Sequence, residues 1–186
     1  MVPTREEAIA LLNEYVKTEN MRHHCLASEA VMRELAIKTG HDEHKWAMTG
    51  LLHDLDAGIT EEEPKKHGLI TAALLREHEV DEDMIDAIIM HNDMAHGKER
   101  HTTFQHALAA AETITGMIKA TTLVYPDKRI ASVKPKSVTK RMKQKGFAVS
   151  VNRDNILECE KIGVPLQEFV NIAMDGMKKI SEDIGL

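Results

Sequence analysis

The residues of this sequence best suited to carry chemistry are the adjacent pair His53-Asp54, which follows Leu51 and Leu52. Imidazole and carboxylate groups together suit a divalent transition metal. Neighbouring residues on a regular helix point in different directions, so both side chains reach one ion only where the helix ends. Gly58, just downstream, fits such an end. On the dipeptide alone, a helix end with one histidine and a solvated aspartate is the favoured explanation, because short motifs match by chance. The placement of the other histidines must therefore decide.

The elements that position this pair are predicted to be helices. Leu, Ala, Met, Glu and Lys dominate the sequence, and all of them favour helix. Aromatic residues make up only 3% of the chain against 11 methionines, so the core must rest on aliphatic and thioether side chains. Alternating β-branched patterns are rare, which leaves strands little support. We therefore expect an all-α fold, and 186 residues suit a single domain.

Capping residues and apolar periodicity set the expected helix boundaries. The main bundle is expected to cover about residues 20–120. The basic segment and the C-terminal helices, residues 126–186, are expected to form an extension that packs on it. Helices are predicted over about residues 4–16, 20–40, 42–54, 61–78, 81–92, 103–124, 137–145 and 152–162, and from 165 onward.

Further candidate ligands lie on separate predicted helices. At about 100° per residue, His24 falls within the apolar stripe of its helix and His23 on the solvated side. The same count puts Asn92 on the apolar side of its helix and His91 at the border, so either could turn inward. Helical bundles build metal sites from ligands scattered in this way, although His24 alone would also fit a core histidine. The candidates are His24, His53, Asp54, His67, His91 and Glu112.

Their order along the chain resembles the HD-domain superfamily of metal-dependent phosphohydrolases. The stretch Arg22-His23-His24-Cys25 is similar to the first element of the family signature. Leu51-Leu52-His53-Asp54 is similar to the second and is the most specific of the three. Ala111-Glu112-Thr113 is similar to the last. The resemblance implies an HD-domain helical bundle with a C-terminal helical extension, and a divalent metal held by His24, His53, Asp54 and Glu112.

His67-Gly68 and His91-Asn92 look like the variant of this family that holds two metals, and His67 and His91 are the expected ligands of a second ion. Two positions depart from the pattern. Glu112 stands where the family usually has aspartate, so it could bind directly, bind through water, or leave the first metal weakly held. Asn92 stands where two-metal members often carry a second histidine. One metal is expected and a second stays open, with Mn, Fe, Mg, Zn, Co and Ni not distinguished by these ligands.

The charge distribution is uneven. The chain has 24 basic and 30 acidic residues, a net charge of -6 that argues against a dedicated nucleic-acid binder. Residues 128–145 contain eight basic residues and no acidic ones, which indicates a local anion-binding or partner surface. A solvated basic face explains the run equally well. The candidates for holding a substrate phosphate are Lys134, Lys136, Lys140 and Arg141.

The resemblance and the ligand set together favour a metal-dependent phosphohydrolase. In this interpretation His53 and Asp54 are catalytic, and a metal-activated water attacks a phosphomonoester or phosphodiester of a nucleotide or related small molecule. Two alternatives stay open: a degenerate HD module that binds a nucleotide or protein without turnover, and an RNA-associated protein that uses residues 128–145. Two cysteines and no long apolar run favour a cytoplasmic protein without membrane contact.

Overall fold

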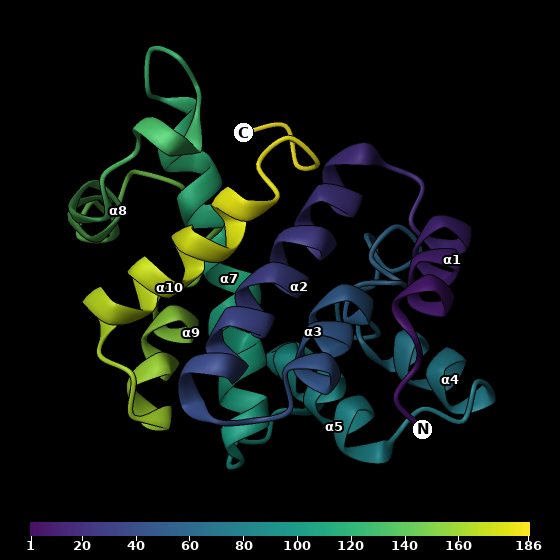
Figure 1. Ribbon diagram of the computed structural model, residues 1–186. Helices are drawn as coiled ribbons and strands as arrows, with labels where there is room; N and C mark the ends of the chain where they lie inside the picture. Colours follow the sequence, from purple (N-terminus) through teal and green to yellow (C-terminus); the bar gives the residue numbers. More distant parts are fainter.

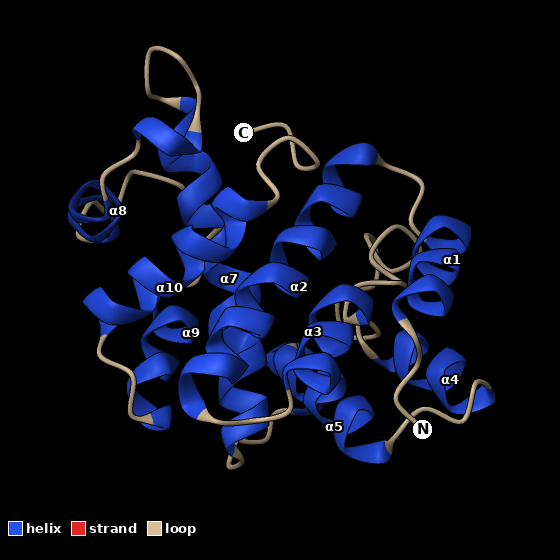
Figure 2. Ribbon diagram, viewed as in Figure 1, coloured by secondary structure: helices blue, strands red, loops and turns tan.

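The computed structural model describes all 186 residues, and every regular element in it is helical (Figure 2), which confirms the all-α prediction. Two long helices, α2 (Glu19–Thr39) and α7 (Thr103–Leu123), lie at the centre and pack against each other (Figure 1). None of the helices combines the length and apolar character that crossing a bilayer requires.

The N-terminal half supplies the helices that surround one face of this central pair. Helix α3 packs on α2, α5 packs on α7 and α3, α4 packs on α5, and α1 packs on α3. The connection between α3 and α4 is a series of turns without regular helix. The bounds of these elements are Arg5–Tyr15 for α1, Glu43–Leu52 for α3, Leu69–Glu77 for α4, Glu82–His91 for α5 and Asp93–His96 for α6.

The C-terminal part covers the other side of the central pair. Helix α10 (Leu166–Lys179) packs on α2, while α9 (Arg153–Leu157) and the 3-10 helix η2 (Glu158–Ile162) pack on α7. Helix α8 (Pro135–Met142) packs on α7 and α10, after the 3-10 helix η1 (Ile130–Ser132). One hydrophobic cluster of 42 buried residues runs from Ala8 to Ile184, so both halves share a core.

A buried guanidinium fastens the C-terminal part to α5 and α7. Arg100 donates to both carboxylate oxygens of Glu158 at 2.7 and 2.8 Å, and to the main-chain oxygen of Met90 at 2.8 Å. His106 contacts the same Glu158 carboxylate at 2.8 Å. Removing one member of such a buried pair leaves the other charge uncompensated, which makes the pair a strong constraint on how the two halves dock.

Most helix ends follow the signals in the sequence. Thr4 and Glu7 form a capping box at α1, Asp42 caps α3, and Gly40 ends α2 with a φ of 72°. Other ends shift by about two residues: α2 is capped by Thr18 instead of Asn20, and α8 begins at Pro135 instead of after a Ser137 cap.

The predicted start of the fourth helix at Glu61 is wrong, because α4 begins at Leu69. The side chain that caps the start of α4 belongs to Asp56, twelve residues before Gly68. Asp56 Oδ2 accepts the main-chain N–H groups of Gly68 at 2.9 Å and Thr71 at 3.0 Å, which are free donors at the start of the helix. Gly68 has a φ of 85°, and a Cβ there would lie 3.1 Å from the Ile88 oxygen, so this junction requires glycine.

Helices α2 and α3 approach most closely at Gly50. A Cβ at this position would lie 2.6 Å from the main-chain oxygen of Ser28 on α2. The carbonyl of Gly50 also accepts a hydrogen bond from the ring of His53, so the close approach helps to set where His53 lies.

The variant Gly50→Ala is expected to lower the free energy of unfolding by about 1–3 kcal/mol, because the added methyl group forces α3 away from α2. Urea unfolding measures the change. Gly58→Ala is the matched control, since a Cβ at Gly58 meets no atom within 4 Å. Equal stabilities for the two variants would contradict the close approach.

Candidate metal centre

Six side chains from five parts of the chain meet between α2, α3, α5 and α7. His24 lies on α2 and Glu112 on α7, while His91 is the last residue of α5. His53 is the C-cap of α3 and Asp54 follows in the turn, so the helix does end at this pair. His67 lies in the turn before α4.

The imidazole Nε2 atoms surround the carboxylate of Asp54. Oδ1 of Asp54 lies 3.0 Å from Nε2 of His67, 3.3 Å from that of His53 and 3.4 Å from that of His91. Oδ2 lies 3.6 Å from Nε2 of His24, and Glu112 Oε2 lies 3.8 Å from the same nitrogen. One buried aspartate is therefore in contact with four histidines.

Each ring is held in place through its other nitrogen. Nδ1–H of His53 donates to the Gly50 oxygen at 2.8 Å, and Nδ1–H of His91 donates to the Ile88 oxygen at 2.5 Å. His67 uses Nδ1 toward Asp56 Oδ1 at 2.8 Å. For His24 the partner is the Thr115 hydroxyl at 2.9 Å, which itself donates to the Glu112 main-chain oxygen and so accepts from the ring.

In His24, His53 and His91 these hydrogen bonds place a proton on Nδ1 and aim the Nε2 lone pair at the centre of the cluster. Nε2 of His24 lies only 3.2 Å from Nε2 of His53, and the same atoms of His67 and His91 lie 3.0 Å apart. Asp54 Oδ1 is buried and has no hydrogen-bond donor aligned with it. Facing lone pairs beside an unpartnered carboxylate oxygen fit a cation, and the ligands are those a transition metal takes.

Electrostatics keeps His53 and Asp54 in the forms that bind a cation. Burial lowers the pKa of His53 to about 3, so its ring is neutral at physiological pH and no proton relieves its contact with His24. Burial alone would raise the pKa of Asp54, but the surrounding histidines outweigh it and hold that pKa well below the usual range. Asp54 is therefore ionised.

His67 behaves differently because it lies between two carboxylates. Burial alone would lower its pKa, but its contacts with Asp54 and Asp56 raise it to about 10. Without a cation, His67 therefore carries a proton on both nitrogens, and Nε2 must lose its proton before it can bind a metal.

Glu112 is the candidate ligand that lies farthest from its neighbour in the cluster, with Oε2 3.8 Å from Nε2 of His24. Burial raises the pKa of its carboxyl group, with the nearby histidines acting against that effect. Its Oε1 accepts a hydrogen bond from the neighbouring Thr113 hydroxyl, while Oε2 faces His24. A divalent cation in the cluster would supply the positive charge that this buried carboxylate lacks.

The ligand atoms fall into two overlapping groups. His24, His53 and Glu112 offer atoms that all lie within 4.8 Å of one another, and so do His53, Asp54 and His91. Asp54 contacts ligands of both groups, through Oδ2 toward His24 and through Oδ1 toward His91 and His67. The arrangement offers one position on the His24 side and another on the His67 side.

Several sequence expectations are corrected at the edge of the cluster. Asn92 does not turn inward, because its Nδ2 donates to the main-chain oxygens of Pro64 at 2.7 Å and His67 at 3.0 Å. His23 was expected on the solvated side but is mostly buried and lines the pocket that opens onto His24.

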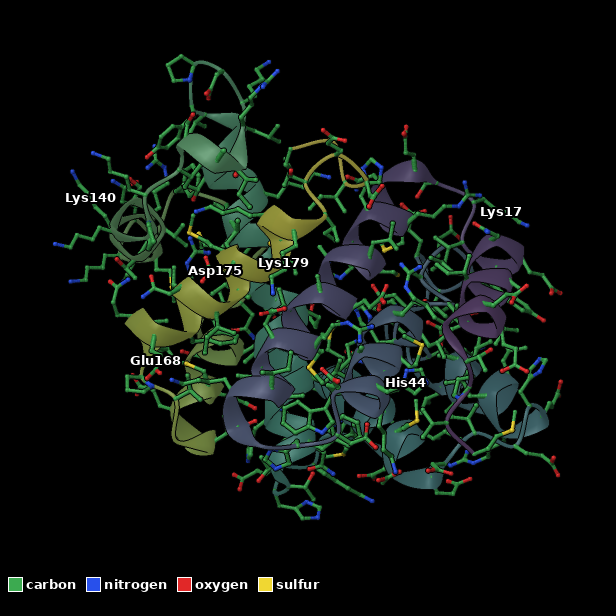
Figure 3. All side chains as sticks on the ribbon, in the orientation of Figure 1. Lys17, His44, Lys140, Glu168, Asp175 and Lys179 are labelled. Carbon is green, nitrogen blue, oxygen red and sulfur yellow. The ribbon has the colours of Figure 1, made fainter.

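The four basic residues proposed for the phosphate lie elsewhere. None of them lines the pocket that opens onto the cluster, and Lys140 on α8 points outward at the edge of the molecule (Figure 3). Lys134, Lys136 and Arg141 are the other three candidates, and they do not line this pocket either.

Sequence reasoning missed three residues that complete the site. Asp56, two residues after Asp54, fixes the ring of His67. Thr115 fixes the ring of His24, and Lys119 lines the pocket beside it. Thr115 and Lys119 follow Glu112 at helical spacing, so the face of α7 that carries Glu112 was a signal for both.

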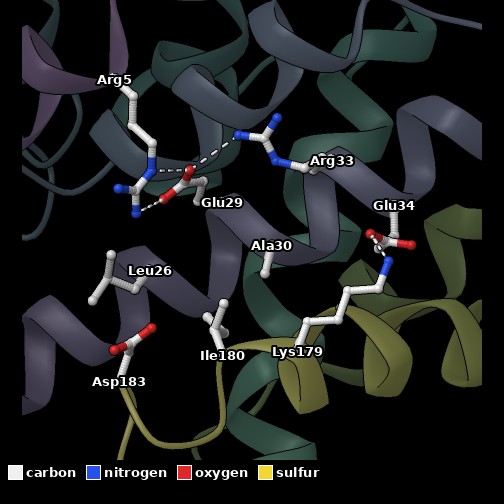
Figure 4. Close-up of a pocket in the computed structure, with 10 residues that line it drawn as sticks. Arg5, Leu26, Glu29, Ala30, Arg33, Glu34, Lys179, Ile180 and Asp183 are labelled. Carbon is white, nitrogen blue, oxygen red and sulfur yellow. Dashed lines mark hydrogen bonds and ion pairs between the residues drawn. The ribbon is translucent and has the colours of Figure 1, made fainter.

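A separate cavity of about 610 Å³ lies between α1, α2 and α10, away from the cluster (Figure 4). Five of its six charged side chains pair with one another, because Glu29 binds Arg5 and Arg33, and Glu34 binds Lys179. It contains none of the candidate ligands, so the chemistry is not located there.

Comparisons with known proteins agree with this geometry. The family model described as HD domain matches residues 21–125. Ribonuclease Y of Thermotoga petrophila and that of Thermotoga maritima are each 27% identical over 172 residues, which is 89% of this chain and 33% of the relative. Ribonuclease Y of a Sulfurovum species is 25% identical over 83% of this chain and 31% of its own length. The chain thus spans about a third of these curated relatives, and no solved structure matches it significantly.

The variant Thr115→Val is expected to weaken binding of the first divalent cation by about 10–100-fold, because the ring of His24 loses the acceptor that fixes its tautomer and orientation. Titration calorimetry with Mn²⁺ measures the effect. Thr122→Val is the matched control: it lies on the same helix, is buried, and its hydroxyl donates to Ile118 without touching a histidine. Equal affinities in the two variants would show that Thr115 does not support a ligand.

Binding of a cation on the His67 side is expected to release one proton at pH 7–8, because a pKa of about 10 leaves His67 protonated until the metal displaces that proton. Affinity at this position should therefore rise by about tenfold per pH unit over this range. Calorimetry in buffers with different ionisation enthalpies counts the protons. A count of zero for the second cation would contradict the assignment of His67.

Proposed function

This chain belongs to the HD domain family, and from that premise we propose that it is a metal-dependent phosphohydrolase acting on a nucleotide or a related small phosphorylated molecule. The single observation that carries the proposal is the set of Nε2 atoms aimed at the ionised carboxylate of Asp54. Family membership rests on a match that covers more than half of the chain, residues 21–125.

In this proposal His24, His53, Asp54 and Glu112 hold one divalent cation, and His67 and His91 with Asp54 hold a second. A divalent cation supplies Lewis acidity to the phosphoryl oxygens and lowers the pKa of water, which provides the nucleophile near neutral pH. The chain contributes by orienting the rings of His24 and His53, by keeping His53 neutral and by keeping Asp54 ionised. Asp56 holds the position of His67 by accepting the hydrogen bond from its Nδ1–H.

The substrate must approach from the His24 side. His24 and Asp54 line the open pocket beside the cluster, whereas His53, His67 and His91 do not. His53 is fully buried, so it reaches a cation but not a bulky substrate. The phosphoryl group is therefore expected to bind on the side of the first metal.

Two observations favour other functions for the same site. Glu112 is weakly engaged, which favours a degenerate module that binds a phosphorylated ligand without turnover. The curated relatives are named Ribonuclease Y, which favours hydrolysis of phosphodiester bonds in RNA. The unpaired basic residues between 128 and 145 fit such a polyanion. Because this chain spans about a third of the length of those relatives, RNA hydrolysis is only an alternative to the proposed function.

The variants His53→Ala and Asp54→Ala are expected to lose both bound metal and phosphate release, because each removes an atom from the centre of the cluster. Metal analysis of the purified variants and a phosphate-release assay over nucleotides, with each divalent metal in turn, measure the two effects. Circular dichroism checks that the helices are kept, and His41→Ala is the control, since that exposed histidine lies outside the cluster.

Full metal content and activity in either variant would contradict the site. A wild-type protein that binds nucleotide with every metal but releases no phosphate would favour the module without turnover.

A further inference from the structure

A pocket of about 480 Å³ opens onto the metal cluster from the His24 side. Helices α2 and α7 form two of its walls, and Asp54 of the cluster also lines it. Ser150, Met177 of α10 and the C-terminal segment after α10 form the rest. The part of the chain that matches the HD family model ends at residue 125, so the last walls come from outside that match.

Lys119 is the only lysine or arginine among the residues that line this pocket. It lies on α7, four residues after Thr115 and seven after Glu112, which places the three on one face of the helix. Its ammonium group donates to the side-chain oxygen of Asn20 at the start of α2, across the pocket. No carboxylate forms an ion pair with it, in contrast to Lys45 and Lys179, which bind Asp81 and Glu34. The charge of Lys119 is therefore available to a ligand.

The wall away from the cluster is apolar. Met177 on α10 and the C-terminal residues Ile184 and Leu186 face the pocket together with Met21 and Ala27 of α2. The eight basic residues of the segment 128–145 contribute nothing to the lining. Beyond the metal ligands, the pocket thus offers one cation at one side and apolar surface at the other.

We propose that this pocket binds a phosphomonoester with a single phosphoryl group and an uncharged organic group, and that Lys119 binds the phosphoryl oxygens opposite the metal cluster. The inference rests on the proposed function, because it takes the phosphoryl group to lie beside His24 and Asp54. Beside the metal cluster, Lys119 is the one lysine or arginine of the lining, which suits a single phosphoryl group. A diphosphate, a triphosphate or an RNA strand carries further phosphoryl groups, for which the lining has no second lysine or arginine.

The test uses the metal-loaded full chain and three kinds of probe: a pair of p-nitrophenyl esters, the adenosine nucleotides and an RNA strand. The proposal predicts that p-nitrophenyl phosphate is hydrolysed at least about tenfold faster, in kcat/KM, than bis-p-nitrophenyl phosphate. It predicts the same order for AMP over ADP and ATP, and no cleavage of a single-stranded RNA oligonucleotide. Faster cleavage of the diester or of RNA would overturn it.

The variant Lys119→Met tests the residue itself. Because a charge-assisted hydrogen bond to phosphate is lost, KM for p-nitrophenyl phosphate and the inhibition constant of inorganic phosphate should both rise by about tenfold or more. The change in kcat should be smaller, and the affinity for Mn²⁺ should stay unchanged. Lys119→Arg should recover most of the phosphate affinity. Lys98→Met is the control and should leave all these values unchanged, because this exposed lysine precedes the start of α7, at the opposite end of the helix from Lys119, and does not line the pocket.

Binding of inorganic phosphate to the metal-loaded protein separates this inference from the proposed function. If no ester is hydrolysed, the proposed function fails, while weaker phosphate binding in Lys119→Met still supports the role of Lys119. If phosphate binds equally well to the wild type and Lys119→Met, the role of Lys119 is overturned even in an active enzyme.

Discussion

The contact between the Asp54 carboxylate and the Nε2 atoms of four histidines is the constraint on which the rest of this structure depends. Lone pairs that face one another away from water are costly, and Nε2 of His24 lies 3.2 Å from Nε2 of His53. Beside them, the ionised Asp54 carboxylate has the protonated His67 as its positive partner when no metal is bound. The Nδ1 hydrogen bonds of His24, His53 and His91 prevent these rings from turning to relieve the repulsion. A divalent cation would relieve it by binding the facing nitrogens, which is why the arrangement favours metal binding over a structural role.

Features that look unrelated follow from this requirement. Helix α3 has to end at His53 so that Asp54 can face the same centre, and the close approach of Gly50 to α2 brings His53 within 3.2 Å of His24. The turns between α3 and α4 have to return to the cluster, and the Asp56 carboxylate organises them by capping α4 and holding His67. The C-terminal part then completes the pocket beside the cluster, held in its place by the buried pair of Arg100 and Glu158.

How far the sequence predicts this structure differs from element to element. Helical periodicity and caps predicted the helical fold and most helix ends, because these signals are local. The long apolar stripe of α2 predicted which member of its pair reaches the cluster, His24, but it did not predict that His23 is as enclosed as His24. At the end of α5 the stripe is short, and the sequence left His91 and Asn92 as equal candidates. The structure separates them, because Asn92 is taken up by the main-chain oxygens of Pro64 and His67.

What the sequence did not predict depends on contacts between distant segments. The start of α4 is set by Asp56, and no rule of local capping connects that residue to Gly68 twelve positions later. The basic segment 128–145 was the most visible cluster of positive charge in the sequence, yet the pocket takes its one lysine, Lys119, from α7. Only the packing of α7 against α2 shows that this single residue lies beside the cluster.

A crystal structure of the protein loaded with Mn²⁺, with anomalous data collected at the manganese edge, tests the central claim most directly. The account predicts an anomalous peak at bonding distance from Nε2 of His53 and from the carboxylate of Asp54, with the four histidine rings oriented as they are here. A peak at any other place on the molecule, or rings of His24 and His53 turned away from Asp54 in the loaded protein, would contradict it.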